Sequence, residues 1–435
     1  MPSRNRKIFI KYASLISSNR NSRISRFEKI WTYITFSLGS IALLFVIGLS
    51  YDRVERIISP IVSQFVSLTP LTKPQHPRYE VFGFAPYWTI NKLDSVEFSS
   101  LTTFAYFGVP IKETGGLDKE DYGYTVFKSR KATNVFRKAH DNGVRVVLTI
   151  TCMDNDNIES FLGSDQAREK TIADTIHEVR ERGIDGVNID VEYIGTPDAI
   201  YREKFSEFVS HLTEKMHTEI PGSYVTVSVY ASSAKKLKLY DISRIGKAAD
   251  GVFMMAYDFA VKGSDYAMPT SPLYGYKEGK YSYDIATAVE DFKQYMPGNK
   301  IILGVPYYGY NYLVYDEPRV KAETRPSWSW RGKPMTQTYE IATDSIKAER
   351  EGWDDLGQVG WKAYYVSSVD AWRMIFLDDV RSLGIKYDFA KSQNLGGVGM
   401  WALGFDSGKS ELWAVLKEKF GTKNLADSRT FAEIR

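Results

Sequence analysis

Short apolar runs rich in β-branched and aromatic residues alternate along the chain with longer segments in which apolar residues recur every three or four positions. Ile172, Ile176 and Val179 follow the second pattern, which ends at Gly183, a residue type that commonly terminates helices. The alternation predicts strands and helices in turn, and therefore a parallel sheet. The apolar runs are Val81–Phe84, Thr103–Phe107, Val144–Leu148, Gly186–Glu192, Tyr224–Val229, Gly251–Tyr257, Lys300–Val305 and Gly397–Leu403.

Eight such runs within residues 79–421 fit an α/β fold of the (β/α)8 TIM-barrel type better than an open doubly wound sheet. About 90 residues separate the seventh run from the eighth, and their middle is rich in aromatic residues and alternating patterns. We therefore expect a small α+β insertion subdomain at about 308–378, between strands 7 and 8. Residues 422–435 are expected to form a C-terminal tail.

The N-terminal pattern differs from the rest, because residues 30–51 contain no charged side chain and could cross a bilayer core of ~30 Å as one helix. Residues 1–29 before this stretch are basic, which predicts a cytoplasmic N-terminus and a single-pass membrane anchor with the body on the extracytoplasmic side. A cleaved signal peptide is the alternative, but no Ala-x-Ala site follows the apolar run. Residues 52–78 contain four prolines, a composition that predicts a linker.

Charge and cysteine content narrow the possible partners. The first 50 residues hold eight Lys/Arg against one Glu, which leaves 48 basic and 52 acidic residues, or −4, for residues 51–435. The body is therefore not expected to bind nucleic acid. A single cysteine excludes an intramolecular disulfide and a Cys-cluster metal site, and the five histidines have no metal-ligand spacing. We expect no metal and no cofactor.

The fourth apolar run carries the clearest chemical signal. Asn188, Asp190 and Glu192 alternate with three apolar residues, so the period of a strand places them on one face. In a closed barrel that face points inward, where an unpaired carboxylate costs several kcal/mol or becomes protonated. A polar face turned to solvent at a sheet edge is the alternative. A fourth strand of eight has no such edge, so the pattern indicates a catalytic or binding role.

This run, Asp185-Gly-Val-Asn188-Ile-Asp190-Val-Glu192, resembles the Asp-x-x-Asp-x-Asp-x-Glu signature of glycoside hydrolase family 18, the chitinase-like enzymes. Asn188 stands where the family usually has its second Asp. Further similarities in family order extend over residues 80–415. They are Val81–Trp88 at the first strand, Met255–Asp258 at the sixth, Leu303–Gly309 at the seventh and Gly396–Trp401 at the eighth.

The resemblance implies a retaining hydrolase of N-acetylglucosamine-containing glycans. Glu192 would be the general acid, Asp190 would orient the substrate's 2-acetamido group, and the Tyr257 hydroxyl would bind the acetamido oxygen. In this substrate-assisted mechanism the acetamido oxygen attacks the anomeric carbon.

The expected substrate-binding residues are Asn188, Asp258, Trp401, Tyr87, Trp88 and Tyr307. Trp401 has the same parity as Gly397 and Gly399, whose missing side chains would leave room for its indole as a floor for one sugar. A core Trp is the alternative for Trp401, and packing is the alternative for the other aromatic residues.

Three departures from the family pattern affect specificity, and one of them is Thr149-Ile150-Thr151-Cys152 at the third strand, where the family has Ser-x-Gly-Gly. Asn188 can hydrogen-bond to Asp190 but cannot share a proton with it, and Asn at this place resembles cell-wall-acting members of the spore-cortex glucosaminidase type. Tyr310 stands where chitinases often carry Arg. Peptidoglycan and chitin-type glycans both remain candidate substrates.

Two other functions compete with a glycoside hydrolase. One is a lectin-like protein on the same barrel, which is disfavoured because Glu192, Asp190 and Tyr257 are all present. The other is a barrel enzyme of unrelated chemistry.

Overall fold

The computed structural model describes residues 79–236, 238–325 and 334–421. The chain divides into two units, Met1–His76 and Pro77–Arg435, and all described residues belong to the second. The predicted basic segment, anchor helix, linker and C-terminal tail lie outside the described residues. Within the described residues, no helix has both the length and the apolar character that a membrane span requires.

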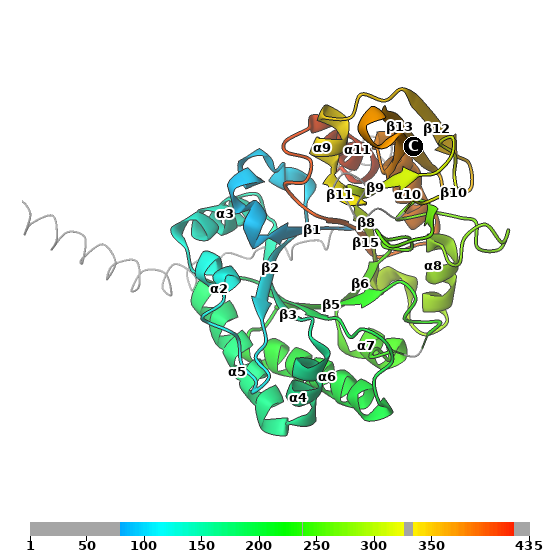
Figure 1. Cartoon of the computed structure of the whole chain (residues 1–435). Coiled ribbons are helices and arrows are strands. Elements are labelled where there is room, and N and C mark those ends of the chain that lie inside the picture. Colours follow the sequence, from blue (N-terminus) through cyan, green and yellow to red (C-terminus); the bar gives the residue numbers. More distant parts are fainter. Residues whose placement is uncertain (1–78, 237, 326–333, 422–435) are drawn as a thin grey trace, which may run out of the picture. The chain divides into compact units, whose positions relative to one another are not determined.

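In the described part of the chain, eight parallel strands close into a barrel (Figure 1). Each coincides with one of the predicted apolar runs, which confirms the barrel. Around the barrel the strand order is β1-β15-β8-β6-β5-β4-β3-β2. The strands are β1 (Glu80–Pro86), β2 (Thr103–Pro110), β3 (Arg145–Cys152), β4 (Gly186–Val191), β5 (Tyr224–Tyr230), β6 (Gly251–Met255), β8 (Ile301–Pro306) and β15 (Gly397–Trp401).

Helices surround the strands, as Figure 1 shows. Helix α5 ends at Gly183, as the sequence predicts, and this glycine takes the left-handed conformation. At the start of the helix, the Ser164 hydroxyl accepts a hydrogen bond from the Ala167 backbone N–H. The helices are α2 (Tyr122–Phe127), α3 (Arg130–Asp141), α4 (Asn155–Gly163), α5 (Asp165–Arg182), α6 (Ala199–Glu219), α7 (Ile242–Ala248), α8 (Ile285–Lys293), α10 (Val380–Ser392) and α11 (Ser410–Phe420), with the 3₁₀ helix η1 (Tyr87–Ser95) after β1.

The two faces of the barrel strands have different surroundings, the helices outside and the barrel interior inside. On β4, Val187, Ile189 and Val191 pack with the helices in the large outer core. The alternate positions, Asn188 and Asp190, face the interior, as the period of two predicts. The interior is filled by a smaller apolar cluster that includes Phe82, Phe84, Ala105, Val147, Phe253, Met255 and Ile302.

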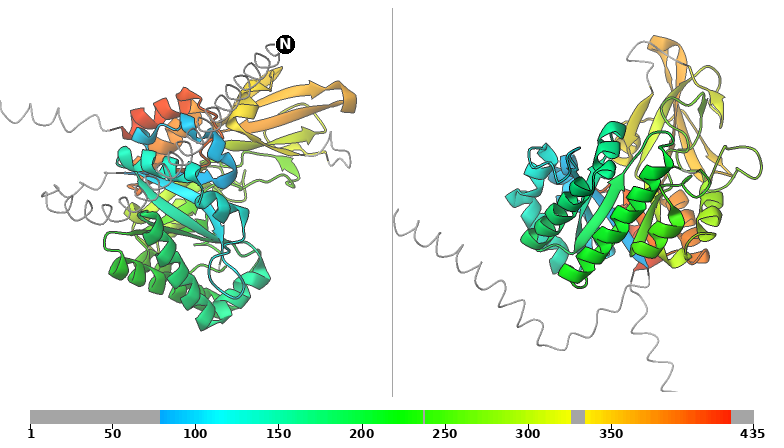
Figure 2. Two further views of the ribbon diagram at one scale, coloured as in Figure 1. Left: turned by 90° about the vertical axis from the view of Figure 1, so that its left-hand side faces the viewer. Right: turned by 90° about the horizontal axis from the view of Figure 1, so that it is seen from below.

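Between β8 and β15 the chain forms a separate antiparallel sheet, at the place where the sequence predicts the 308–378 insertion. Figure 2 shows this sheet beside the barrel in both views. The sheet order is β11-β9-β14-β13-β12, and the small α9 accompanies it. The elements are β9 (Tyr308–Val314), β11 (Met335–Thr338), α9 (Tyr339–Asp344), β12 (Arg350–Asp354), β13 (Val359–Val366) and β14 (Ala371–Leu377).

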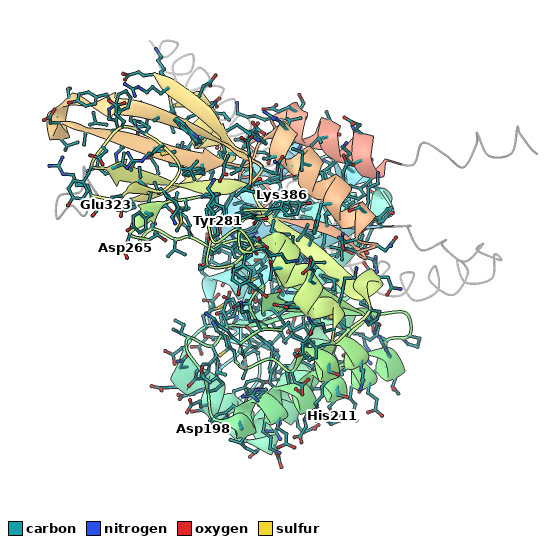
Figure 3. The ribbon with its side chains drawn as sticks, turned by 90° about the vertical axis from the view of Figure 1, so that its right-hand side faces the viewer. Asp198, His211, Asp265, Tyr281, Glu323 and Lys386 are labelled. Atoms are coloured by element: carbon teal, nitrogen blue, oxygen red, sulfur yellow. The ribbon has the colours of Figure 1, made fainter. Side chains whose placement is uncertain are left out.

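Buried polar contacts fix the inserted sheet to the barrel. Asp354 at the end of β12 accepts hydrogen bonds from Lys280 Nζ (2.6 Å) and from the hydroxyl of Tyr281, which is labelled in Figure 3. Both donors belong to the long connection between β6 and α8, which also carries β7 (Tyr266–Ala267), paired with β10 (Ala322–Glu323). Lys386 of α10 forms a buried ion pair with Asp378, directly after β14. These contacts anchor the inserted sheet to the connection before α8 and to α10.

Candidate active site

A cavity of about 530 Å³ opens at the carboxyl ends of the barrel strands, the end where barrel enzymes hold their active sites. Asp190, Glu192, Tyr257, Asp258 and Trp401 all line it. The residues to which the sequence assigns acid, orienting and sugar-floor roles therefore meet in one place, although they come from β4, β6 and β15.

Asp190 and Glu192 stand in line on one wall. Asp190 is the penultimate residue of β4 and is only 3% exposed, whereas Glu192 follows the strand and is half-buried. The backbone N–H of Glu192 donates to the carbonyl of Cys152 on β3 (2.9 Å), so strand pairing continues past β4 and fixes the direction of the side chain. Oδ1 of Asp190 is buried and has no hydrogen-bond partner among the described residues. A buried acceptor without a partner indicates a place for an incoming donor.

The pKa of both carboxyl groups is raised. Burial raises the pKa of Asp190 well above its usual range, and the charge of Glu192 acts in the same direction. Burial also raises the pKa of Glu192, as does the charge of Asp258. A hydrogen bond from the Tyr230 hydroxyl and the charge of Lys238 oppose this shift. The raised pKa of Glu192 is the property that a general acid needs near neutral pH.

Asp258 is held by the inserted sheet. Its Oδ1 accepts hydrogen bonds from the hydroxyls of Tyr308 (2.5 Å) and Tyr310 (2.8 Å) on β9, and from Thr270 Oγ1 (3.2 Å). Its backbone adopts φ 59°, a left-handed conformation that is uncommon outside glycine and that often marks functional sites. Tyr310 thus supplies a hydroxyl to Asp258 where chitinases often carry Arg.

Asn188 does not reach the cavity, so its predicted contact with substrate is wrong. The residue is 0% exposed. It lies two positions before Asp190 on β4 and therefore on the same face of the strand. Its Nδ2 donates to Ser228 Oγ (3.0 Å), and its Oδ1 accepts from Thr226 Oγ1 (2.8 Å), both on β5. Within the described residues no hydrogen bond joins Asn188 to Asp190, because the neighbouring strand already satisfies the amide.

Trp401 forms one side of the cavity together with Phe84 and Phe107. Its ring lies 4.6 Å from that of Phe107 and 5.6 Å from that of Phe84, centroid to centroid. The predicted role of the glycines on β15 is wrong: a Cβ on Gly399 would lie 2.5 Å from the Phe253 ring, so the space serves the interior core. A Cβ on Gly397 would meet the Glu80 backbone at 2.0 Å.

The three other predicted aromatic platforms lie outside the cavity lining. Trp88 is 51% exposed and stands beside it, with its ring 6.4 Å from Trp401. Tyr87 packs against Trp88 and Tyr122 instead. Tyr307 is 0% exposed and packs in the outer core beside Tyr387, so its predicted sugar contact is wrong.

Parity along β8 explains the error at Tyr307. Ile301, Leu303 and Val305 face the outer core, and Tyr307 continues that series. Tyr308 has the opposite parity and lines the cavity. The period of two was therefore the signal that could have favoured Tyr308 over Tyr307 from the sequence.

Several cavity residues were not identified from the sequence. Tyr230 is the last residue of β5, and its hydroxyl faces Glu192. Burial raises the pKa of the Tyr230 phenol, and the charge of Glu192 raises it further. Lys236 and Lys238 follow in the connection to α7, and Ser282 and Tyr283 come from the connection before α8. The four loop residues follow no period, so no pattern marked them, whereas Tyr230 continues the inward-facing series of Thr226 and Ser228 on β5.

One group of described side chains, His177, Glu178 and Glu181 on α5, brings potential metal-ligand atoms together. Glu178 already forms ion pairs with Lys119 and Lys128, at 3.0 Å each, and accepts a hydrogen bond from the Tyr124 hydroxyl. Two ammonium groups on the central carboxylate make this a poor cation site.

A parallel (β/α)8 barrel with two adjoining carboxyl groups of raised pKa at its carboxyl end is the architecture of a barrel glycosidase. The chain belongs to glycosyl hydrolases family 18, whose family model matches residues 80–406. Among curated relatives it is 25% identical over 363 residues to the human di-N-acetylchitobiase, covering 79% of this chain and 85% of that protein. It is 24% identical to the cortical fragment-lytic enzyme of Bacillus anthracis, covering 74% of this chain and 68% of that protein.

A third relative, the putative sporulation-specific glycosylase YdhD of Bacillus subtilis, is 26% identical over 58% of this chain and 55% of its own length. Solved structures agree on the fold. A chitinase from Cycas revoluta in complex with (GlcNAc)3 matches with a TM-score of 0.66 at 21% identity, over 79% of this chain and 100% of that one. The spore cortex-lytic enzyme SleL of Bacillus cereus matches with a TM-score of 0.61 at 17% identity, over 79% and 74%.

Proposed function

We propose that the protein is a retaining glycosidase that cleaves β-1,4 bonds of N-acetylglucosamine-containing glycans by substrate-assisted catalysis. The observation that carries the proposal is the placement of Asp190 and Glu192 on one wall, about 7 Å apart along a strand. Two carboxyl groups in that relation cannot flank the anomeric carbon from opposite faces, as a conventional retaining pair does.

The third carboxylate of the described lining, Asp258, is not a free nucleophile. Three hydroxyl donors converge on its Oδ1, and they lower its electron density and fix its position. The nucleophile must therefore come from elsewhere. In this family the 2-acetamido oxygen of the substrate acts as the nucleophile.

Each cavity residue then has a defined task. Glu192 donates a proton to the glycosidic oxygen as the bond to the anomeric carbon breaks. Asp190 accepts a hydrogen bond from the acetamido N–H through its unpartnered Oδ1, and Tyr257 donates its hydroxyl to the acetamido oxygen. Trp401 supports the apolar face of the sugar ring. Water activated by Glu192 then opens the cyclic intermediate with retention of configuration.

Peptidoglycan is the substrate we favour. Two relatives, the cortical fragment-lytic enzyme and the putative sporulation-specific glycosylase, have names that refer to the spore cortex or to sporulation. The N-terminal apolar stretch and its basic flank support an exported, membrane-anchored body, which would face a cell wall.

A Glu192→Gln variant tests the assignment of the acid. We expect kcat/KM on N-acetylated glycans to fall by about 10²–10⁴-fold, because the amide cannot donate the proton, while glycan affinity is retained. The matched control is Glu159→Gln, which changes an acid outside the cavity lining. Equal release of reducing ends by wild type and Glu192→Gln, with equal binding, would instead identify a lectin-like protein.

A further inference from the structure

A cationic segment borders the cavity beside the proposed acid. Between β5 and α7 the chain carries Lys235, Lys236 and Lys238, of which Lys236 and Lys238 line the cavity. Lys235 is already engaged, because its Nζ contacts the Tyr276 hydroxyl (2.5 Å) and lies 4.0 Å from the centre of that ring. Neither Lys236 nor Lys238 forms an ion pair with any of the residues that the structure describes.

Lys238 has a defined position. Its Nζ lies 4.5 Å from the centre of the Tyr230 ring, and its carbonyl accepts a hydrogen bond from Arg202 Nε (2.8 Å). Burial lowers the pKa of Lys238, and the charge of Lys236 lowers it further, whereas Glu192 opposes both effects. Two ammonium groups that repel each other in a partly buried cavity create a site where a bound anion would be stabilised.

The lysines lie on the side of the cavity away from the Trp401 floor. They follow β5, and β5 stands opposite β1 in the closed strand order. Phe84 of β1 and Trp401 of the adjacent β15 form the aromatic side. If the sugar that keeps the anomeric carbon stacks on Trp401, the glycosidic oxygen lies at Glu192 and the leaving sugar extends toward Tyr230 and Lys238.

We propose that Lys236 and Lys238 bind a carboxylate carried by the leaving sugar, and so select acidic glycans over neutral chitin-type ones. This inference rests on the proposed function. In peptidoglycan the carboxylate has two possible sources: the 3-O-lactyl group of N-acetylmuramic acid, and the peptide stem attached to that group. Both present the same chemistry to the two ammonium groups.

The test compares kcat/KM on three soluble substrates. They are the neutral tetramer (GlcNAc)4, alternating GlcNAc–MurNAc oligosaccharides freed of peptide, and the same oligosaccharides with their stems. For Lys236→Gln/Lys238→Gln we expect the ratio of acidic to neutral kcat/KM to fall about 10-fold or more relative to wild type, since two charge-assisted hydrogen bonds are lost. The stem-free and stem-bearing arms identify which carboxylate is bound.

The control is Lys215→Gln, which removes an exposed lysine of α6 and lowers the net charge by one, half the change made by the double variant. Its ratio should stay within twofold of wild type. A ratio that also stays within twofold in the double variant contradicts the inference, and so does an equal fall in the Lys215 control.

Binding in the Glu192→Gln background separates this inference from the proposed function. If acidic oligosaccharides bind in a lysine-dependent manner but wild type cleaves none of the three substrates, the lysine site stands and the proposed function fails. If wild type cleaves them and the lysine replacements alter neither binding nor the ratio of kcat/KM values, the proposed function stands and the lysine site fails.

Discussion

At the scale of single residues, the proposed mechanism depends on the protonation of Glu192 beside Asp190. Both pKa values are raised by burial, so the protonated forms persist to higher pH than in water. Activity that requires protonated Glu192 is therefore retained to higher pH than an ordinary glutamic acid would allow, and is lost as the pH rises through the raised pKa.

Replacing Asn188 by Asp tests how closely this pair is coupled to the residue below it. A third carboxyl group on the same inner face adds negative charge, which raises the pKa of both neighbours. We expect the alkaline limb of the pH–kcat/KM profile to move to higher pH, with the melting temperature recorded as a control for loss of the bond to Ser228. A limb that stays in place would show that position 188 is electrostatically isolated from Asp190, and a limb that moves to lower pH would contradict the expected direction.

The sequence identified the acids and missed several contacts around them. Period-two alternation placed Asp190 inside the barrel because a strand permits only two directions for its side chains. Applied to β8, the same rule distinguishes Tyr307 from Tyr308. The lysines after β5 could not be found in this way, since the direction of a loop side chain depends on contacts with distant segments such as that between Lys238 and Arg202.

At the scale of elements, the inserted sheet contributes side chains to the candidate active site. Its strand β9 begins directly after barrel strand β8 and brings the hydroxyls of Tyr308 and Tyr310 to Asp258. Eight strands were predictable because each is a local apolar run. The order β11-β9-β14-β13-β12 was not, because antiparallel partners far apart in sequence are chosen by packing.

The double variant Tyr308→Phe/Tyr310→Phe tests this role. Removing both hydroxyls leaves Asp258 with Thr270 as its donor among these contacts, so the existing charge of Asp258 is less neutralised and acts more strongly on Glu192. We expect kcat to fall about 10-fold and the alkaline limb of the pH profile to move to higher pH. The conservative control is Tyr364→Phe, whose hydroxyl accepts from Asn311 on the inserted sheet away from Asp258. Loss of stability without any change in the pH profile would assign the tyrosines to packing alone.

At the scale of the whole molecule, the barrel is joined to an N-terminal stretch with the composition of a membrane anchor, residues 30–51. The basic residues before it place the barrel outside the cytoplasm in our proposal. Protease added to intact spheroplasts that express the full chain should remove the barrel and leave a short membrane-bound basic fragment. A barrel protected from protease until the cells are lysed would contradict this orientation.

The central claim is that the substrate's own acetamido group acts as the nucleophile, and the anomeric form of the first product tests it most directly. Proton NMR of N-acetylated β-1,4 oligosaccharides during the first minutes of reaction should detect the β-anomer before mutarotation. Oligosaccharides with a free amine at the cleaved sugar should remain intact. Initial formation of the α-anomer, or equal cleavage of the N-deacetylated substrate, would contradict the mechanism.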